Sequence, residues 1–292
     1  MRSKRNMAVP VEHYIEEENL SLAWSRAFLA LAARRDEEIV PLLVSITGFA
    51  GGVPAEDEAV RKALDACLAA NEYQGSHTVA NTIFPQSLWR RAKGDRNALY
   101  EEYLENLPSY VDMAPDKNRC GLYFSRLIAY GVDPKTGERL AEVQIGKLPG
   151  LGNQLEFLIQ RCKKGVRKSM FQAAVFAPAR DHVGGAQQGF PCMQHVTFVP
   201  DYDKKMLAVN AFYATQQLFV KAYGNYLGLT RLGAFFADQT GLTLTKVSCF
   251  AGVEKMDQRP AAGPTLDALI AAAEAAVRGA GAQADVPVEV VG

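Results

Sequence analysis

The sequence predicts an α+β fold in which one mixed β-sheet packs against helices. Three observations support this: a globular composition of 48% hydrophobic and 22% charged residues over 292 residues, short apolar runs of strand length among amphipathic helical stretches, and no repeat or clear domain break. A chain of this length can bury a large core without disulfides or a structural metal. We therefore expect a single domain over 1–292, with a core from about 80 to 255, an N-terminal helical part over 1–75, and a C-terminal helix and tail over 264–292.

The N-terminal third predicts three helices and one short strand. Apolar residues recur at helical spacing in the helices, whereas the strand is a brief apolar run. The predicted helices span 20–35, 56–72 and 97–107, and the predicted strand spans 41–46. Asn19 or Ser21 is suited to cap the first helix. Cys67 falls on the apolar side of the second helix, so we expect it in the core.

The middle of the chain predicts most of the sheet. Residues 121–130 are interpreted as a strand or the approach to one, and the Gly- and Pro-rich segment 134–152 as an excursion. The predicted elements that follow are a helix over 153–164 and strands over 170–177, 190–199 and 206–213. Gly165 is a suitable C-terminal cap for that helix, and Cys162 in its last turn is expected at the surface.

A long, aromatic-rich segment over 215–239 predicts the central buried helix. Its apolar residues follow a helical period, and its composition is too apolar for a helix with one solvated face. A final strand is predicted over 243–251, then a linker through Gly263, a helix over 265–277, and a loosely held tail.

Composition excludes several classes of protein. The chain has 32 Lys and Arg against 32 Asp and Glu, so strong binding of nucleic acid through a basic surplus is not expected. No apolar stretch has the length of a membrane span or the position of a signal sequence, so we expect a cytoplasmic protein without a membrane partner. The five cysteines form no C-x-x-C pair, and neither a disulfide framework nor a metal site is predicted.

Two residues suggest chemistry. Cys192 follows a proline and a Gly- and Gln-rich loop at the start of a predicted strand, and Arg180 is near enough in sequence to favour its thiolate. Asn225 lies in the most apolar helix, where its amide can read the edge of a pyrimidine or can be a satisfied core group. His195 invites a Cys–His hydrolase interpretation, but residues i and i+3 of a strand point to opposite faces.

The region 153–252 resembles the thymidylate synthase superfamily. Matching motifs occur in the same order and at similar spacing: Asn153-Gln-Leu, Arg167-Lys168 before a strand, Phe176-Ala-Pro-Ala179, Pro191-Cys192, Asn225, Thr240-Gly-Leu242 and Gly252. Gly121-Leu-Tyr123 is similar to a further family motif upstream.

The chain also departs from the family pattern. The family's Gln-Arg-Ser-x-Asp run, which holds the substrate, falls on Tyr213-Ala-Thr-Gln-Gln217, so Thr215 and Gln217 replace its serine and aspartate. The His-x-Tyr that holds the sugar becomes Lys255-Met-Asp257, and the Glu-x-x-Trp motif can be placed only on Gln86-Ser-Leu-Trp89. An amide in place of a carboxylate removes an acid/base group.

The resemblance implies a one-carbon transfer to C5 of a pyrimidine nucleotide, methyl or hydroxymethyl, with methylenetetrahydrofolate as donor. Cys192 would add to C6 and Asn225 would hold the base; Tyr123 would relay a proton, or is simply packing. Arg167 and Lys168 would bind phosphate from the partner subunit of a homodimer packed through its sheet, or are an exposed basic pair. Arg180 is a further candidate for the phosphate. The alternative is a catalytically silent nucleotide-binding or assembly protein on the same scaffold.

Overall fold

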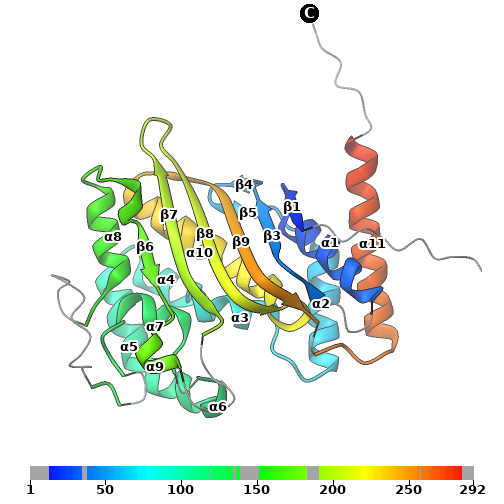
Figure 1. Ribbon diagram of the computed structural model, residues 1–292, viewed down its shortest axis with the longest axis horizontal. Coiled ribbons are helices and arrows are strands. Elements are labelled where there is room, and N and C mark those ends of the chain that lie inside the picture. Colours follow the sequence, from blue (N-terminus) through cyan, green and yellow to red (C-terminus); the bar gives the residue numbers. More distant parts are fainter. Residues whose placement is uncertain are drawn as a thin grey trace, which may run out of the picture.

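The computed structural model describes residues 13–34, 38–118, 120–133, 136–138, 151–182, 191–256 and 258–284. Within them the predicted α+β fold is confirmed, because a mixed sheet packs against helices (Figure 1). The predicted excursion over 134–152, the Gly- and Gln-rich loop before Cys192, Asp257 and the tail lie wholly or mostly outside the described residues.

The helices and strands alternate along the chain. The helices are α1 (Leu20–Ala32), α2 (Glu58–Ala70), α3 (Ser76–Ile83), α4 (Gln86–Ala92), α5 (Arg96–Asp112), α6 (Pro115–Asn118), α7 (Tyr123–Ile128), α8 (Gln154–Cys162), α9 (Pro178–Asp181), α10 (Tyr223–Thr240) and α11 (Pro264–Ala284). The strands are β1 (Tyr14–Glu17), β2 (Glu38–Ile39), β3 (Leu42–Ile46), β4 (Phe49–Ala50), β5 (Val53–Pro54), β6 (Gln172–Ala174), β7 (Met193–Asp201), β8 (Met206–Gln217) and β9 (Thr243–Lys255). A 3₁₀ turn, η1 (Lys168–Met170), precedes β6, and a π-helical turn, η2 (Leu218–Ala222), leads into α10.

The main sheet has the strand order β1-β3-β9-β8-β7-β6, with β2 also paired to β9. β7 and β8 form an antiparallel hairpin, whereas β8 and β9 are parallel and are joined by α10. Parallel neighbours need such a crossover, and the crossover places α10 against the sheet. β4 and β5 form a separate two-stranded ribbon.

The helix α10 is the buried centre of the molecule, as predicted. Two glycines allow α3 to cross it closely: a Cβ added at Gly224 would lie 2.5 Å from the Val79 Cβ, and one at Gly228 would lie 2.8 Å from the Ala80 carbonyl oxygen. The aromatic residues that supplied the helical period are core residues, among them Tyr226, Phe235 and Phe236.

The other face of the sheet carries an aromatic row. His195, Phe212 and Phe250 stack across β7, β8 and β9, with ring centroids 5.9 and 5.2 Å apart. Leu43 and Tyr14 continue the same row across β3 and β1. In Figure 1 the helix α10 lies behind β7, β8 and β9. Val209 of β8 faces Gly233 of α10, and side chains alternate along a strand, so Phe212 and the row face away from α10.

The N-terminal predictions hold in their main features. The first helix is α1, and the Asn19 side chain accepts a hydrogen bond from the Leu22 backbone N–H, which selects Asn19 over Ser21 as its cap. Cys67 is fully buried, as expected. The strand β1 was not predicted. Its polar, short sequence has no apolar run, and its pairing to β3 supplies the order instead.

Three other predictions were wrong. Residues 123–128 form the helix α7 rather than a strand, because Ser125 caps the Leu122 N–H and the apolar run is buried on every side, which hides its period. The long helix does not begin at Thr215, because β8 continues to Gln217 by pairing with β9. Cys162 is buried rather than at the surface, with Tyr202 and Thr240 beside its thiol.

None of the described helices is both long and apolar enough to cross a membrane. The described residues also contain no group of three or more His, Cys, Asp or Glu side chains arranged to hold a metal ion.

Candidate functional site

The thiol of Cys192 lies at the head of β7, where that strand meets β8. The residue is half-buried, and its carbonyl oxygen accepts hydrogen bonds from the Ala214 N–H at 3.3 Å and from Gln194 Nε2 at 3.1 Å. The pairing of β7 with β8 is irregular between Met193 and His195, so Gln194 is turned out of the ladder. This irregularity places Cys192 beside the last residues of β8.

A buried ion pair fixes the segment next to Gln194. Arg126 of α7 donates to both carboxylate oxygens of Asp181 at 2.7 Å, and the Ala177 N–H donates to the same carboxylate at 2.7 Å. The N–H groups of Val175 and of the next residue donate to the Gln194 carbonyl at 2.8 and 2.9 Å. The ion pair therefore fixes the backbone of residues 175–177, which donates hydrogen bonds to the start of β7.

Tyr123 lies beside Cys192, at the first turn of α7. The backbone N–H groups of Cys192 and Met193 approach its hydroxyl, and its ring meets that of Tyr213 edge-on with centroids 6.3 Å apart. Burial raises the pKa of the Tyr123 hydroxyl, so it remains protonated at neutral pH. The structure thus brings together the two residues expected to be catalytic, with Tyr123 on a helix instead of a strand.

Two lysines provide the positive charge near the thiol. Burial raises the pKa of Cys192, and the charges of Lys221 on η2 and Lys255 at the end of β9 partly oppose that rise. The sequence assigned this role to Arg180, which instead lies over the Tyr130 ring at 4.8 Å. Burial lowers the pKa of Arg180, and the neighbouring Arg126 adds to that effect.

Thr215 and Gln217 lie at the C-terminal end of β8, paired with Val253 and Lys255 of β9. Both are half-buried and are therefore partly open to solvent. They lie one and three residues beyond Ala214, whose backbone N–H donates to the Cys192 carbonyl. They are therefore at the same edge of the sheet as the thiol.

Asn225 is buried in the first turn of α10, with an exposed fraction of 3%. The next residue, Tyr226, interacts electrostatically with Tyr213 and Glu254, so Asn225 lies one position from the groups that surround the thiol.

Arg167 and Lys168 are exposed and lie elsewhere, at the turn before β6. The Phe171 carbonyl that follows them accepts from the Phe198 N–H, six residues along β7 from Cys192. At the rise of a β-strand this is roughly 20 Å from the thiol. Within one chain these two bases are not brought to the site.

The sequence interpretation missed a buried polar cluster behind the thiol. It consists of Tyr213, Gln216, Tyr226, Cys249 and Glu254, all with exposed fractions of 2% or less. Gln216 and Cys249 are joined at 3.9 Å, and Cys249 and Tyr226 both interact with Glu254. No signal in the sequence marks this cluster, because Gln216 lies between Thr215 and Gln217, Glu254 lies beside Lys255, and ionisable side chains are rarely fully buried.

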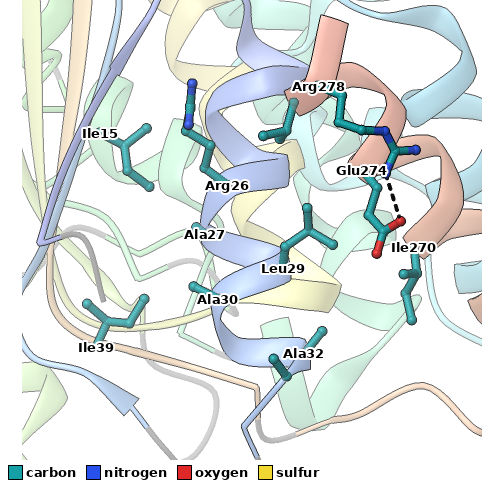
Figure 2. A pocket seen from close by; sticks show the side chains of 12 residues that line it. Ile15, Arg26, Ala27, Leu29, Ala30, Ala32, Ile39, Ile270, Glu274 and Arg278 are labelled. Atoms are coloured by element: carbon teal, nitrogen blue, oxygen red, sulfur yellow. Dashed lines mark hydrogen bonds and ion pairs between the residues drawn. The ribbon is translucent and has the colours of Figure 1, made fainter. Parts of the chain in front are cut away.

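A groove of about 520 Å³ lies away from this site, between α1, α11 and the edge of the sheet (Figure 2). Ile15, Leu29 and Ile270 give it an apolar lining, and the Arg278–Glu274 ion pair lies on its α11 side. None of the predicted site residues lines it, so the groove is separate from the candidate chemistry.

Comparisons with protein-family models and with curated proteins found no match to this chain.

Proposed function

We propose that this protein is a thymidylate-synthase-like transferase that adds a one-carbon group, methyl or hydroxymethyl, to C5 of a pyrimidine nucleotide. The observation that carries the proposal is the half-buried Cys192 at the head of β7, with Tyr123 at its backbone and Lys221 and Lys255 near its sulfur. A cysteine flanked by cations is the arrangement that covalent catalysis requires.

The chemistry begins with the thiol in its protonated form. A bound nucleotide that excludes water strengthens the attraction of Lys221 and Lys255 for a thiolate. The thiol gives its proton to solvent, the resulting thiolate adds to C6 of the pyrimidine, and C5 becomes nucleophilic. Asn225 holds the polar edge of the base, and Thr215 and Gln217 line the approach. Methylenetetrahydrofolate, a second substrate, is the one-carbon donor that the resemblance implies.

A second candidate function is a catalytically silent nucleotide-binding or assembly protein. Two observations favour it: the position of the family's Glu-x-x-Trp carboxylate is held by Gln86 on α4, and burial keeps the Cys192 thiol protonated in the free protein. A protein of either kind with these five free thiols suits a reducing, cytoplasmic setting.

The proposal includes a homodimer that packs through the aromatic row of His195, Phe212 and Phe250. Such a contact covers an apolar face that no described helix covers. It also allows Arg167 and Lys168 to reach the phosphate of a nucleotide in the partner's site, which they cannot reach in their own chain. Replacing Phe212 by Glu is expected to yield monomers in sedimentation equilibrium and to weaken nucleotide binding.

The test of catalysis is release of tritium from C5. The protein is incubated with 5-tritiated dUMP, dCMP, UMP or CMP, with and without methylenetetrahydrofolate, and tritiated water is counted. We expect release from one of these nucleotides and its loss in Cys192→Ala. A protein that binds a nucleotide but releases no tritium from any of them would refute the transferase and leave the silent nucleotide-binding protein.

A further inference from the structure

Two fully buried polar groups behind Cys192 have no hydrogen-bond partner in the described part of the chain. They are the hydroxyl of Tyr213 on β8 and both carboxyl oxygens of Glu254 on β9, each residue with an exposed fraction of 0%. A buried polar group without a partner costs on the order of 1–3 kcal/mol. An arrangement that leaves several such atoms unpaired in one place indicates a partner that arrives with a ligand or as ordered water.

The two groups belong to the buried polar cluster described above, and Tyr213 connects that cluster to the thiol. Tyr213 interacts with Cys192 and Tyr123, and also with Cys249 and Tyr226. Cys249 and Tyr226 in turn interact with Glu254. Tyr213 and Glu254 therefore share two neighbours, and Tyr213 also neighbours the thiol.

The register of the sheet gives the distance between Cys192 and Glu254. Cys192 lies beside Ala214 of β8, and Glu254 pairs with Gln216 of the same strand. The separation of the two Cα atoms is thus two strand spacings across and two residues along, or roughly 12 Å. A nucleotide base attached to the sulfur would reach the Tyr213 hydroxyl before it reached Glu254.

Burial favours the protonated form of both groups. Burial raises the pKa of Glu254 and of Tyr213 well above their ordinary values. The titratable groups that interact with Glu254 are Tyr226 and Cys249, and burial favours the neutral form of both. The two lysines, Lys221 and Lys255, act on Cys192 instead. The carboxyl of Glu254 can therefore act as a proton donor.

We propose that Tyr213 donates a proton to the pyrimidine and that Glu254 resupplies that proton to Tyr213 through intervening water, because the two groups are not hydrogen-bonded to each other. This deepens the proposed function and rests on it. When the Cys192 thiolate adds to C6, the electron pair of the C5–C6 double bond moves through C4 onto O4 of uracil or N3 of cytosine. That atom takes the Tyr213 proton, Tyr213 takes the Glu254 proton, and Glu254 becomes a carboxylate. The protons return when the double bond at C4 re-forms.

The experiment compares Tyr213→Phe and Glu254→Gln with Tyr103→Phe. Tyr103 is a matched control, because its hydroxyl is also buried without a partner, its ring packs against Tyr110 and Phe124, and Cys192 is not among the groups that act on its hydroxyl. Release of tritium from 5-tritiated dUMP and dCMP is measured across pH, together with binding of the same nucleotides. We expect Tyr213→Phe and Glu254→Gln to bind nucleotide but to release tritium at least about 100-fold more slowly. We expect Glu254→Gln also to lose the fall in rate at alkaline pH, and Tyr103→Phe to match the unmodified protein.

An infrared difference spectrum keeps the test independent of turnover. The stretching band of a protonated carboxyl should shift when dUMP or dCMP binds, and it should be missing in Glu254→Gln. If Glu254→Gln does not fold, Glu254→Leu serves for the rate and the spectrum.

Each outcome separates the two proposals. Normal tritium release in Tyr213→Phe or Glu254→Gln overturns the proton relay and leaves the transferase intact. If the unmodified protein releases no tritium, the transferase fails, and the carboxyl band then decides: a shift with nucleotide supports Glu254 in the site, and an unchanged band overturns it. A protein that binds neither nucleotide overturns both.

Discussion

Removing the charge of Asp181 should destabilise the protein and loosen the candidate site together. Asp181→Asn leaves the Arg126 guanidinium, with an exposed fraction of only 3%, without a charged partner. It also weakens two charge-assisted hydrogen bonds of 2.7 Å and one from Ala177. Breaking a buried pair on one side costs about 3–5 kcal/mol. For a chain of this size that corresponds to a fall in Tm of about 6–10 °C.

The assay is urea unfolding followed by circular dichroism, with thermal unfolding beside it. Glu274→Gln is the control, because the Arg278–Glu274 pair is an exposed i,i+4 pair on α11 and should contribute no more than about 0.5 kcal/mol. In Asp181→Asn we also expect faster alkylation of Cys192, since the segment that bonds to the Gln194 carbonyl is no longer fixed.

The double variant Arg126→Met with Asp181→Leu tests the physical reason. It removes both charges, so most of the lost stability should return. A destabilisation of Asp181→Asn below about 1 kcal/mol would refute the reasoning, because such a value belongs to exposed pairs. So would a double variant no more stable than Asp181→Asn.

Three further predictions concern charge and packing. Lys221→Met should raise the pKa of Cys192 further and slow its alkylation by iodoacetamide at pH 8, measured by peptide mass spectrometry. Glu254→Gln should gain stability relative to the unmodified protein as pH rises from the ordinary glutamate pKa of 4.5, by up to about 1.4 kcal/mol per pH unit until the raised pKa is reached, in urea unfolding at each pH. Gly224→Ala should lose about 1–3 kcal/mol despite alanine's better helix propensity, because its Cβ would meet α3 at 2.5 Å.

The controls for these variants lie on exposed parts of the chain. Lys204→Met, in the exposed turn between β7 and β8, should leave the Cys192 alkylation rate unchanged. Gly279→Ala on α11 meets nothing within 4 Å and should stabilise the protein by up to about 1 kcal/mol. For Glu254 the sign is the test: the folded chain keeps its proton to a higher pH than the unfolded chain, so unmodified stability falls as pH rises. If the difference in unfolding free energy between Glu254→Gln and the unmodified protein does not change with pH, the raised pKa of a buried Glu254 is contradicted.

Local signals in the sequence predicted the elements that depend on local chemistry. Asn19 caps α1, and the aromatic period of α10 identified the buried central helix. The failures occurred where distant pairing decides the structure. Thr215 has a helical neighbourhood in sequence but is a strand residue because β9 lies alongside it. Tyr123 belongs to an apolar run whose burial on all sides hides its period.

The site was predictable in part for the same reason. Cys192 and Tyr123 could be picked out as candidates from motifs, and the structure places them side by side. Lys221 and Glu254 could not, because the approach of Lys221 to the thiol depends on the π-helical turn η2, and the burial of Glu254 depends on the packing of α10 over β9. Neither can be inferred from spacing along the chain.

The order of the sheet has a consequence for how the chain folds. The N-terminal strand β3 has its antiparallel partner in β9, so Leu42 pairs with Ala251 across most of the length of the chain. At synthesis rates of roughly 5–20 residues per second, β3 waits on the order of 10–40 s for that partner. The edge of β3 that does not pair with β1 therefore stays unpaired until β9 follows. A nascent chain stopped before β9 would expose both β3 and β8 as unpaired edges, which makes the N-terminal half the natural place for a chaperone to bind during synthesis.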